Sequence, residues 1–157
     1  MKRQTEGDFM TREKIAQWAW VAGILDGEGC IAIDKAKISG HKDYGGLIVT
    51  VCMTSQDTVV RLQEITHVGS IRPRKDKRTT RKRTYQWRAY SREAAALLHH
   101  CFPFLVTKRP QASLALQYAE IMKFQRHTSP GKPVPSASLA RRQCLREAIA
   151  QLNQKGT

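Results

Sequence analysis

Acidic residues are scarce in this chain of 157 residues: 13 Asp and Glu stand against 27 Lys and Arg, which gives a formal net charge of +14. Such an imbalance is rare in enzymes that act on neutral metabolites, and it indicates a polyanionic partner. Long apolar runs are missing as well, since the longest, Trp18 to Leu25, has eight residues including a glycine. A run of that length is too short to span a membrane, and no signal peptide opens the chain, so we expect no membrane partner.

Cysteine is also sparse, and no two cysteines form a Cys-x-x-Cys pair. The four are widely spaced: Cys30, Cys52, Cys101 and Cys144. A chain of this length buries one core without a disulfide framework, so we expect reduced cysteines and an intracellular protein. It is too short for two ordinary domains. We therefore expect a flexible N-terminal segment over residues 1–10 and a single domain over residues 11–157.

The apolar pattern predicts two helix-and-hairpin units followed by further helices. Apolar residues three and four apart predict helices, while strict alternation predicts half-buried strands. The helices are expected from Thr11 to about Glu28, from Thr54 or Ser55 to Gly69, from Ser91 to about Phe102, from Pro110 onward, and over residues 136–154. The strands are expected at Cys30–Lys37, Leu47–Met53, Ile71–Lys75 and Thr84–Tyr90. This order predicts an α+β fold with an αββαββα core, in which a four-stranded antiparallel sheet carries helices on one face and leaves the other free for a large partner.

Positive charge is densest in the second hairpin. Residues 72–92 contain ten of the Lys and Arg side chains and one acid, Asp76. A hairpin with this charge density fits the phosphates that line a nucleic-acid groove. The alternative is a solvated loop that keeps the protein soluble, which is less favoured because aromatic and polar side chains alternate with the charges.

The last strand of that hairpin has two different faces. Its apolar face is expected to pack on helices and consists of Tyr85, Trp87 and Ala89. Gln86, Arg88 and Tyr90 share the other face, which should meet the ligand. Arg88 suits bidentate reading of guanine, and Gln86 suits adenine.

The first helix carries a stripe of very small residues, Ala19, Gly23 and Gly27. Glycine inside a helix costs about 1 kcal/mol relative to alanine, so two on one face indicate the close approach of another helix. Asp26 and Glu28 follow at the end of this helix. Acids are disfavoured there by the helix dipole, so their position indicates a nearby cation, although two exposed surface acids are the simpler alternative.

Residues 21–29, Val-Ala-Gly-Ile-Leu-Asp-Gly-Glu-Gly, resemble the nine-residue signature of the LAGLIDADG homing endonucleases. The resemblance includes the small residues, the two acids and the closing glycine, and it falls at a helix-to-strand junction followed by a hairpin. Val21, Gly27 and Glu28 depart from the signature, standing in place of Leu, Ala and Asp. Residues 68–72 resemble the family's turn into its third strand, and residues 103–112 resemble its Pro-x-Leu segment with a later Lys and Gln-Ala. The resemblance covers about residues 12–125.

The resemblance implies a sequence-specific, metal-dependent DNA endonuclease of intron mobility with a saddle-shaped sheet. Because the chain has one motif, two copies would form a homodimer that cuts both strands of a long, nearly palindromic site. Glu28 matches the metal-binding acid, Gly27 would add a backbone carbonyl, and hard oxygen ligands favour Mg²⁺ or another divalent cation. The implied dimer-interface residues are Ala19, Gly23, Asp26 and Gly27.

The resemblance also implies catalytic partners for Glu28. Lys108 matches a basic residue that polarises the attacking water or shields the phosphate, and its alternative is a surface lysine before a helix. A polar residue near the end of the second strand is expected as well. Thr54 and Gln56 are both candidates, and Thr54 is alternatively a helix cap.

The strands of this family read DNA. Asp34 suits cytosine, Arg72 and Arg74 suit guanine or phosphate, and Lys35 and Lys37 suit phosphate. The full set of expected DNA-binding residues is Asp34, Lys35, Lys37, Arg72, Arg74, Lys75, Lys77, Arg78, Arg81, Lys82, Arg83, Gln86 and Arg88. The alternative function is a non-cleaving nucleic-acid binder on the same fold, such as an RNA splicing cofactor. A basic ribosomal or chromatin protein would explain the charge but not the glycine stripe.

Overall fold

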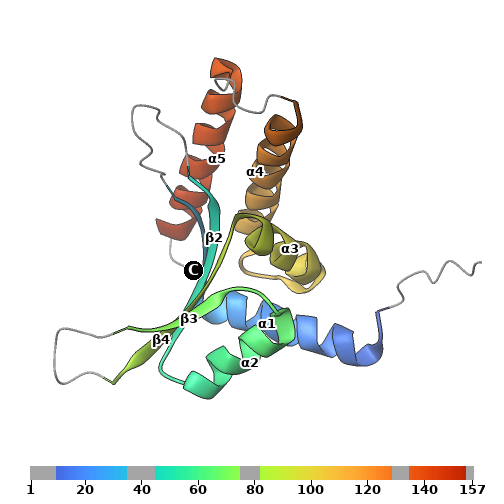
Figure 1. Cartoon of the computed structure of the whole chain (residues 1–157), viewed down its shortest axis with the longest axis vertical. Helices are drawn as coiled ribbons and strands as arrows, with labels where there is room; N and C mark the ends of the chain where they lie inside the picture. The colour runs from blue at the N-terminus through green and yellow to red at the C-terminus, as the bar shows by residue number, and fades with distance from the viewer. Residues whose placement is uncertain (1–9, 35–44, 75–81, 129–134, 155–157) are drawn as a thin grey trace, which may run out of the picture.

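The computed structural model describes residues 10–34, 45–74, 82–128 and 135–154, with only the backbone of residues 125–128. Helices and strands follow one another in the expected order (Figure 1). They are α1 (Arg12–Glu28), β1 (Gly29–Ile33), β2 (Leu47–Met53), α2 (Gln56–Thr66), β3 (Ser70–Arg74), β4 (Thr84–Tyr90), α3 (Ser91–Cys101), a 3-10 turn (Phe102–Phe104), α4 (Arg109–Thr128) and α5 (Ser136–Gln154). The predicted α+β class and αββαββα order are confirmed.

The strands form one antiparallel sheet in the order β1-β2-β4-β3. Helices α1 to α4 pack against one face of this sheet, as predicted. The strand side chains beneath them are 0% exposed: Ile31, Val49, Val51, Trp87 and Ala89. Because side chains alternate along a strand, the residues between these positions lie on the opposite face, which the helices α1 to α4 leave open.

Helix α1 begins where the sequence predicts. The Thr11 side chain caps it by accepting a hydrogen bond from the backbone N–H of Lys14 at 3.3 Å. Val21, Ala22 and Leu25 face the core and are 0% exposed. The small-residue stripe lies on the other side of the helix, so it takes no part in the core of its own chain.

Helix α2 is capped by Ser55, whose Oγ accepts from the backbone N–H of Thr58 at 3.3 Å. Its predicted end at Gly69 is wrong, because the helix ends at Thr66 and His67 adopts the left-handed conformation with φ 55°. Gly69, with φ +82°, instead forms the turn into β3. Its N–H donates to the Glu93 carboxylate at 3.2 Å, which ties the turn to α3.

Replacing Gly69 by alanine is expected to lower the free energy of unfolding by about 2–5 kcal/mol. A side chain at positive φ costs about 1–2 kcal/mol, and the new Cβ would lie 2.7 Å from the buried Trp87 ring, where displacement costs about 1–3 kcal/mol more. Urea unfolding followed by tryptophan fluorescence measures the loss. The matched control is His67→Gly in the same turn, which should leave stability unchanged or slightly raised. Equal stability of Gly69→Ala and the original chain would contradict this account.

Helix α5 protects one edge of the sheet. It packs against α4 and reaches β1, where the Asn153 Nδ2 group donates to the backbone oxygen of Ile31 at 2.9 Å. An outer strand presents unpaired backbone groups that invite pairing with another chain, and this bond occupies one of them. Among the described residues, no helix is long and apolar enough to cross a membrane.

Candidate functional site

The candidate site lies where α1 ends and β1 begins. Glu28 is the last residue of the helix, and both Glu28 and Gly27 are exposed. Gly29 makes the abrupt change to strand possible, since a Cβ on it would lie 2.5 Å from the backbone oxygen of Leu25. The chain therefore holds one carboxylate at the negative end of a helix dipole, a position that attracts cations.

The small-residue stripe of α1 is open. Ala19, Gly23 and Gly27 are exposed, and a Cβ added to Gly23 or Gly27 would meet no neighbouring atom within 4 Å. Contacts within the chain therefore do not require glycine at these two positions. Glycine at these two positions lowers the helix propensity, and the close approach of another molecule to this face would account for it.

Asp26 has a partner within its own chain. One carboxylate oxygen accepts from the backbone N–H of Val106 and the other from that of Lys108, both at 2.8 Å. The half-buried carboxylate thus holds the loop before α4 against the end of α1. The sequence predicts Asp26 as a dimer-interface residue. In the structure it joins two segments of its own chain that lie 82 residues apart in sequence.

Lys108 lies at the same end of α1. Its Nζ donates to the backbone oxygen of Asp26 at 2.9 Å, so the ammonium group lies against the negative end of the α1 dipole. The last turn of α1 contains no basic residue of its own. Lys108 therefore places a positive charge at this helix end, and its hydrogen bond is to the residue two positions before Glu28.

Thr54 and Gln56 flank the residue that caps α2. Gly29 pairs with Val51, so the antiparallel arrangement places the end of β2 at the edge of the sheet where α1 ends. Since Ser55 is the helix cap, the alternative role of Thr54 as a cap is wrong. Thr54 and Gln56 are both exposed, and both remain candidates for the polar partner.

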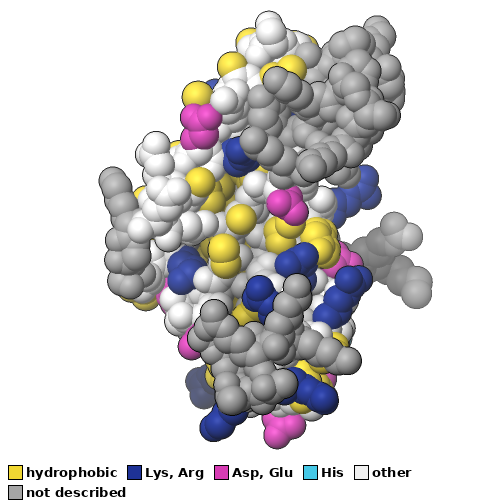
Figure 2. All heavy atoms as spheres, turned by 90° about the vertical axis from the view of Figure 1, so that its left-hand side faces the viewer, with side chains coloured by type: hydrophobic (Ala, Val, Ile, Leu, Met, Phe, Trp, Pro, Cys, Tyr) yellow, Lys and Arg dark blue, Asp and Glu magenta, His cyan; other side chains and the backbone are white. Residues whose placement is uncertain are grey.

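The open face of the sheet carries most of the described residues that were predicted to bind DNA. Arg72 pairs with Gln86 across β3 and β4, and Arg74 pairs with Thr84, so their side chains share this face with Arg88. Asp34 is exposed just after β1, and the exposed Lys82 and Arg83 precede β4. Figure 2 views the molecule from the side to which the β3–β4 hairpin extends, and Lys and Arg side chains gather over its lower half. The predicted residues outside the described ranges are Lys35, Lys37, Lys75, Lys77, Arg78 and Arg81.

The oxygen atoms at the end of α1 are the candidate donors for a metal ion. Within the described part of the chain, no group of three or more His, Cys, Asp or Glu side chains could hold a metal ion. The donors present at the end of α1 are the Glu28 carboxylate and backbone carbonyls, which are hard oxygen ligands of the kind that magnesium and calcium prefer. The donor type therefore fits such a cation.

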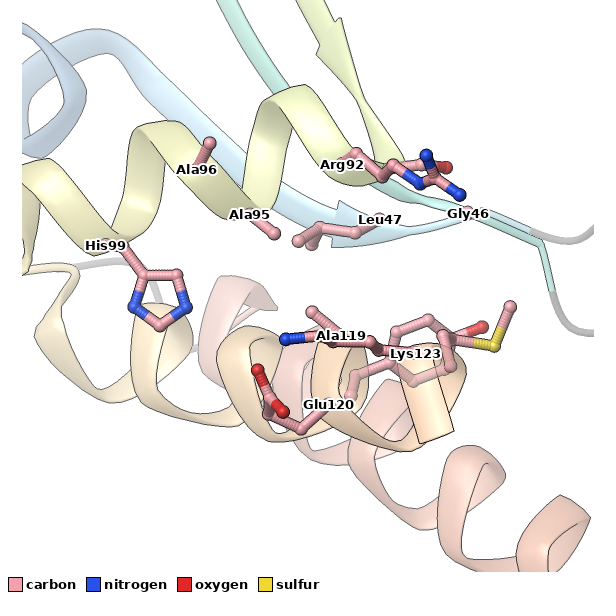
Figure 3. A pocket seen from close by; sticks show the side chains of 12 residues that line it. Gly46, Leu47, Arg92, Ala95, Ala96, His99, Ala119, Glu120 and Lys123 are labelled. Atoms are coloured by element: carbon pink, nitrogen blue, oxygen red, sulfur yellow. The ribbon is translucent and has the colours of Figure 1, made fainter. Parts of the chain in front are cut away.

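One described cavity lies away from the end of α1. It has a volume of about 480 Å³ and is lined by residues of α3 and α4 together with Gly46 and Leu47 at the start of β2 (Figure 3). None of the predicted site residues lines it.

Cys101 of α3 is fully buried and lies near Asp26 at the end of α1. Burial raises the pKa of its thiol to about 12, and the nearby charge of Asp26 adds to the rise. A thiol reagent at pH 8 is therefore expected to modify the exposed Cys30 and Cys144 quickly and Cys101 only after unfolding. Mass spectrometry of the modified peptides checks this order. Rapid labelling of Cys101 in the folded protein would contradict it.

The raised pKa of Cys101 should also make the folded chain less stable in alkali. The folded chain holds the Cys101 proton more tightly than the unfolded chain does, so the free energy of unfolding should fall as pH rises above about 9, by up to about 1.4 kcal/mol per pH unit. Other groups titrate in this range, so the comparison is with Cys101→Ala. The difference in stability between the two proteins should shrink from pH 9 to 11.

Comparisons with solved structures identify the fold. The chain resembles the homing endonuclease I-CvuI in complex with its target in the presence of calcium, with a TM-score of 0.73 and 22% identity over 90% of this chain and 85% of that one. It resembles the archaeal intron-encoded homing endonuclease I-Vdi141I complexed with DNA, with a TM-score of 0.70 and 14% identity over 90% of this chain and 87% of that one. For the LAGLIDADG homing endonuclease I-GzeII in complex with its DNA target, the TM-score is 0.65 and the identity 17%, over 83% of this chain and 43% of that one. This chain has the LAGLIDADG homing endonuclease fold. No protein-family model and no curated protein matches its sequence.

Residues 21–29, which resemble the family signature, have the local structure that the sequence predicted. In this chain the segment forms the last turns of α1 and the first residue of β1, the junction that the sequence predicted. The sequence did not predict two of the contacts that the structure shows. Asp26 holds the loop that carries Lys108, and Asn153 covers the β1 edge. Both join segments far apart in sequence, so no local spacing reveals them.

Proposed function

We propose that this chain is a sequence-specific, divalent-metal-dependent DNA endonuclease that acts as a homodimer and makes a double-strand break in a long, nearly palindromic site. The observation that carries the proposal is the end of α1, where Glu28 is exposed, the Lys108 ammonium group bonds to the backbone oxygen of Asp26 two residues before it, and the glycine stripe is open. The similar structures are homing endonucleases described in complex with DNA, which supports DNA as the substrate.

Two copies are needed to complete the site. In an isologous dimer the same surface of each chain meets its equivalent, so the stripes of two α1 helices would pack together and bring two Glu28 carboxylates to the centre. The stripe permits a close approach because its side chains are a methyl group or hydrogen. This chain covers 43% of I-GzeII, a length at which one longer chain could contain two such units.

The Glu28 carboxylate and the Gly27 carbonyl would hold the cation. A bound magnesium ion, or another divalent cation, would activate a water molecule and stabilise negative charge on the phosphate and the leaving oxygen. Lys108 would polarise the attacking water or shield the phosphate from its position at the helix end. Asp26 holds Lys108 there through the loop backbone, so the lysine needs no reorganisation when DNA binds.

The open face of the sheet would hold the duplex. Arg72 and Arg74 lie on β3, where they can reach phosphates or base edges, and the polar residues of β4 face the same way. The net charge of +14 would steer the chain to DNA and make binding sensitive to salt. The basic residues between β3 and β4 that were predicted to hold phosphates belong to this proposal as well.

A plasmid library with randomised, nearly palindromic inserts tests the function directly. Incubated with the full chain and Mg²⁺, a subset of plasmids should become linear, and chelation of the metal with EDTA should prevent this. Intact plasmids over a broad library with Mg²⁺ present would contradict endonuclease activity. Retained DNA binding without cutting would instead favour the non-cleaving nucleic-acid binder.

A further inference from the structure

Arg88 on β4 is held by two neighbours of its own strand. Its Nη1 donates to the Tyr90 hydroxyl at 2.9 Å, and its Nη2 donates to the Gln86 Oε1 at 3.3 Å. The guanidinium carbon also lies 5.7 Å from the centre of the Tyr90 ring, a cation–π contact. All three residues lie two apart along β4, so their side chains project from the open face of the sheet.

The hydrogen bonds fix which groups remain available for a ligand. A guanidinium group only donates, so the oxygen of Gln86, and not its NH₂ group, must face Arg88. The Tyr90 oxygen accepts from Arg88, which leaves its proton free to be donated outward. The Nε group of Arg88 is buried and has no hydrogen-bond partner among the described residues, so the Arg88 donors left for a ligand are the remaining N–H groups of Nη1 and Nη2. The cluster of Gln86, Arg88 and Tyr90 therefore presents N–H and O–H donors to a ligand.

The flanking strands place short side chains beside Arg88. Thr50 on β2 and Ser70 on β3 are the cross-strand neighbours of Arg88, and both have short side chains. The Tyr90 hydrogen bond also raises the pKa of Arg88, and the charge of Asp34 adds to this, so the guanidinium is always charged. A charged set of donors with short side chains on both sides of its central arginine is well placed to read a base edge.

We propose that Gln86, Arg88 and Tyr90 form one reading unit that selects guanine, in which Gln86 and Tyr90 position Arg88 and Gln86 does not read an adenine of its own. The proposal rests on the proposed function, since it assumes that the open face meets the major groove. Guanine presents two acceptors there, N7 and O6, which match a cluster of donors. Adenine presents one acceptor and one donor, and its N6 hydrogens would have to share the Gln86 oxygen with Arg88, whereas guanine uses only the donors of the cluster.

The inference is tested by selecting bound sites from a randomised duplex library with the full chain. Because bidentate reading of one base gives about 10- to 100-fold discrimination, the original chain should enrich one guanine position in each half-site that Arg88→Ala loses. Gln86→Met, which keeps the length of the side chain but removes the oxygen, should weaken the preference at that same guanine position about tenfold. Tyr90→Phe should weaken the same position. The control Thr84→Ala, on the same face of β4, should leave it unchanged.

The outcomes separate this inference from the proposed function. If Gln86→Met removes a preference for adenine at another position and leaves guanine selection intact, Gln86 reads DNA independently and the inference is wrong. If the original chain enriches no sequence, the proposed function and this inference fail together. Thermal unfolding of each variant establishes that it folds, which is expected since the three side chains are only partly buried.

Discussion

Replacing Glu28 by Gln is expected to reduce DNA cleavage at least about a hundredfold while DNA binding stays within a few-fold of the original. The amide has the same size as the carboxylate but lacks its charge, so it is a poor ligand for a divalent cation, and the charge stabilisation the cation supplies is lost. The side chain is exposed at the helix end, so its loss should leave the core intact. Plasmid cleavage with Mg²⁺ and gel-shift binding to the selected site measure the two effects.

Glu13→Gln is the matched control for this variant. Glu13 lies in the exposed first turn of the same helix, so the control makes the same chemical change and alters the net charge equally. It should cut DNA at the original rate. If Glu28→Gln also cuts at the original rate, Glu28 is not the metal-binding acid. If Glu28→Gln loses binding and cleavage equally, its role is in holding DNA.

The elements and faces of this fold were predictable because their signals are local. The Thr11 cap and the two faces of β4 follow from the geometry of a helix start and the two-residue period of a strand. The end of α2 was not predictable in the same way. His67 adopts a positive φ that the sequence does not mark, because only glycine and asparagine are strongly associated with that conformation.

In the candidate site, too, local features were predictable and contacts between distant segments were not. Glu28 and the glycine stripe were found from the spacing of a few adjacent residues. The contacts of Asp26 with the loop of Lys108 required the folded chain, because the two segments are 82 residues apart. On β4 the alternation placed Gln86 and Arg88 on one face, but it gave no indication that they bond to each other, which changes what each can recognise.

Replacing Gly23 by Leu is expected to weaken dimer formation at least about thirtyfold and to suppress DNA cleavage at the same protein concentration. Overpacking a close contact costs about 1–3 kcal/mol, and an isologous interface meets the new side chain twice. The isolated chain should still fold, because beyond the neighbouring helix backbone no described atom lies within 4 Å of a Cβ at this position, and leucine is a better helix former than glycine. Sedimentation velocity measures the dimer, and urea unfolding measures the stability of the chain.

Two controls isolate the contact between helices. Ala140→Leu adds a similar apolar side chain to an exposed position of α5 and should leave dimer formation and cleavage unchanged. Gly23→Ala adds only a methyl group, so it should stabilise the isolated chain by about 1 kcal/mol while it weakens the dimer less than leucine does. Stability and pairing would then move in opposite directions along the series from glycine to leucine. Such a divergence arises only if the glycine serves a neighbour outside its own chain, and an unchanged dimer in Gly23→Leu would show that the stripe has no partner.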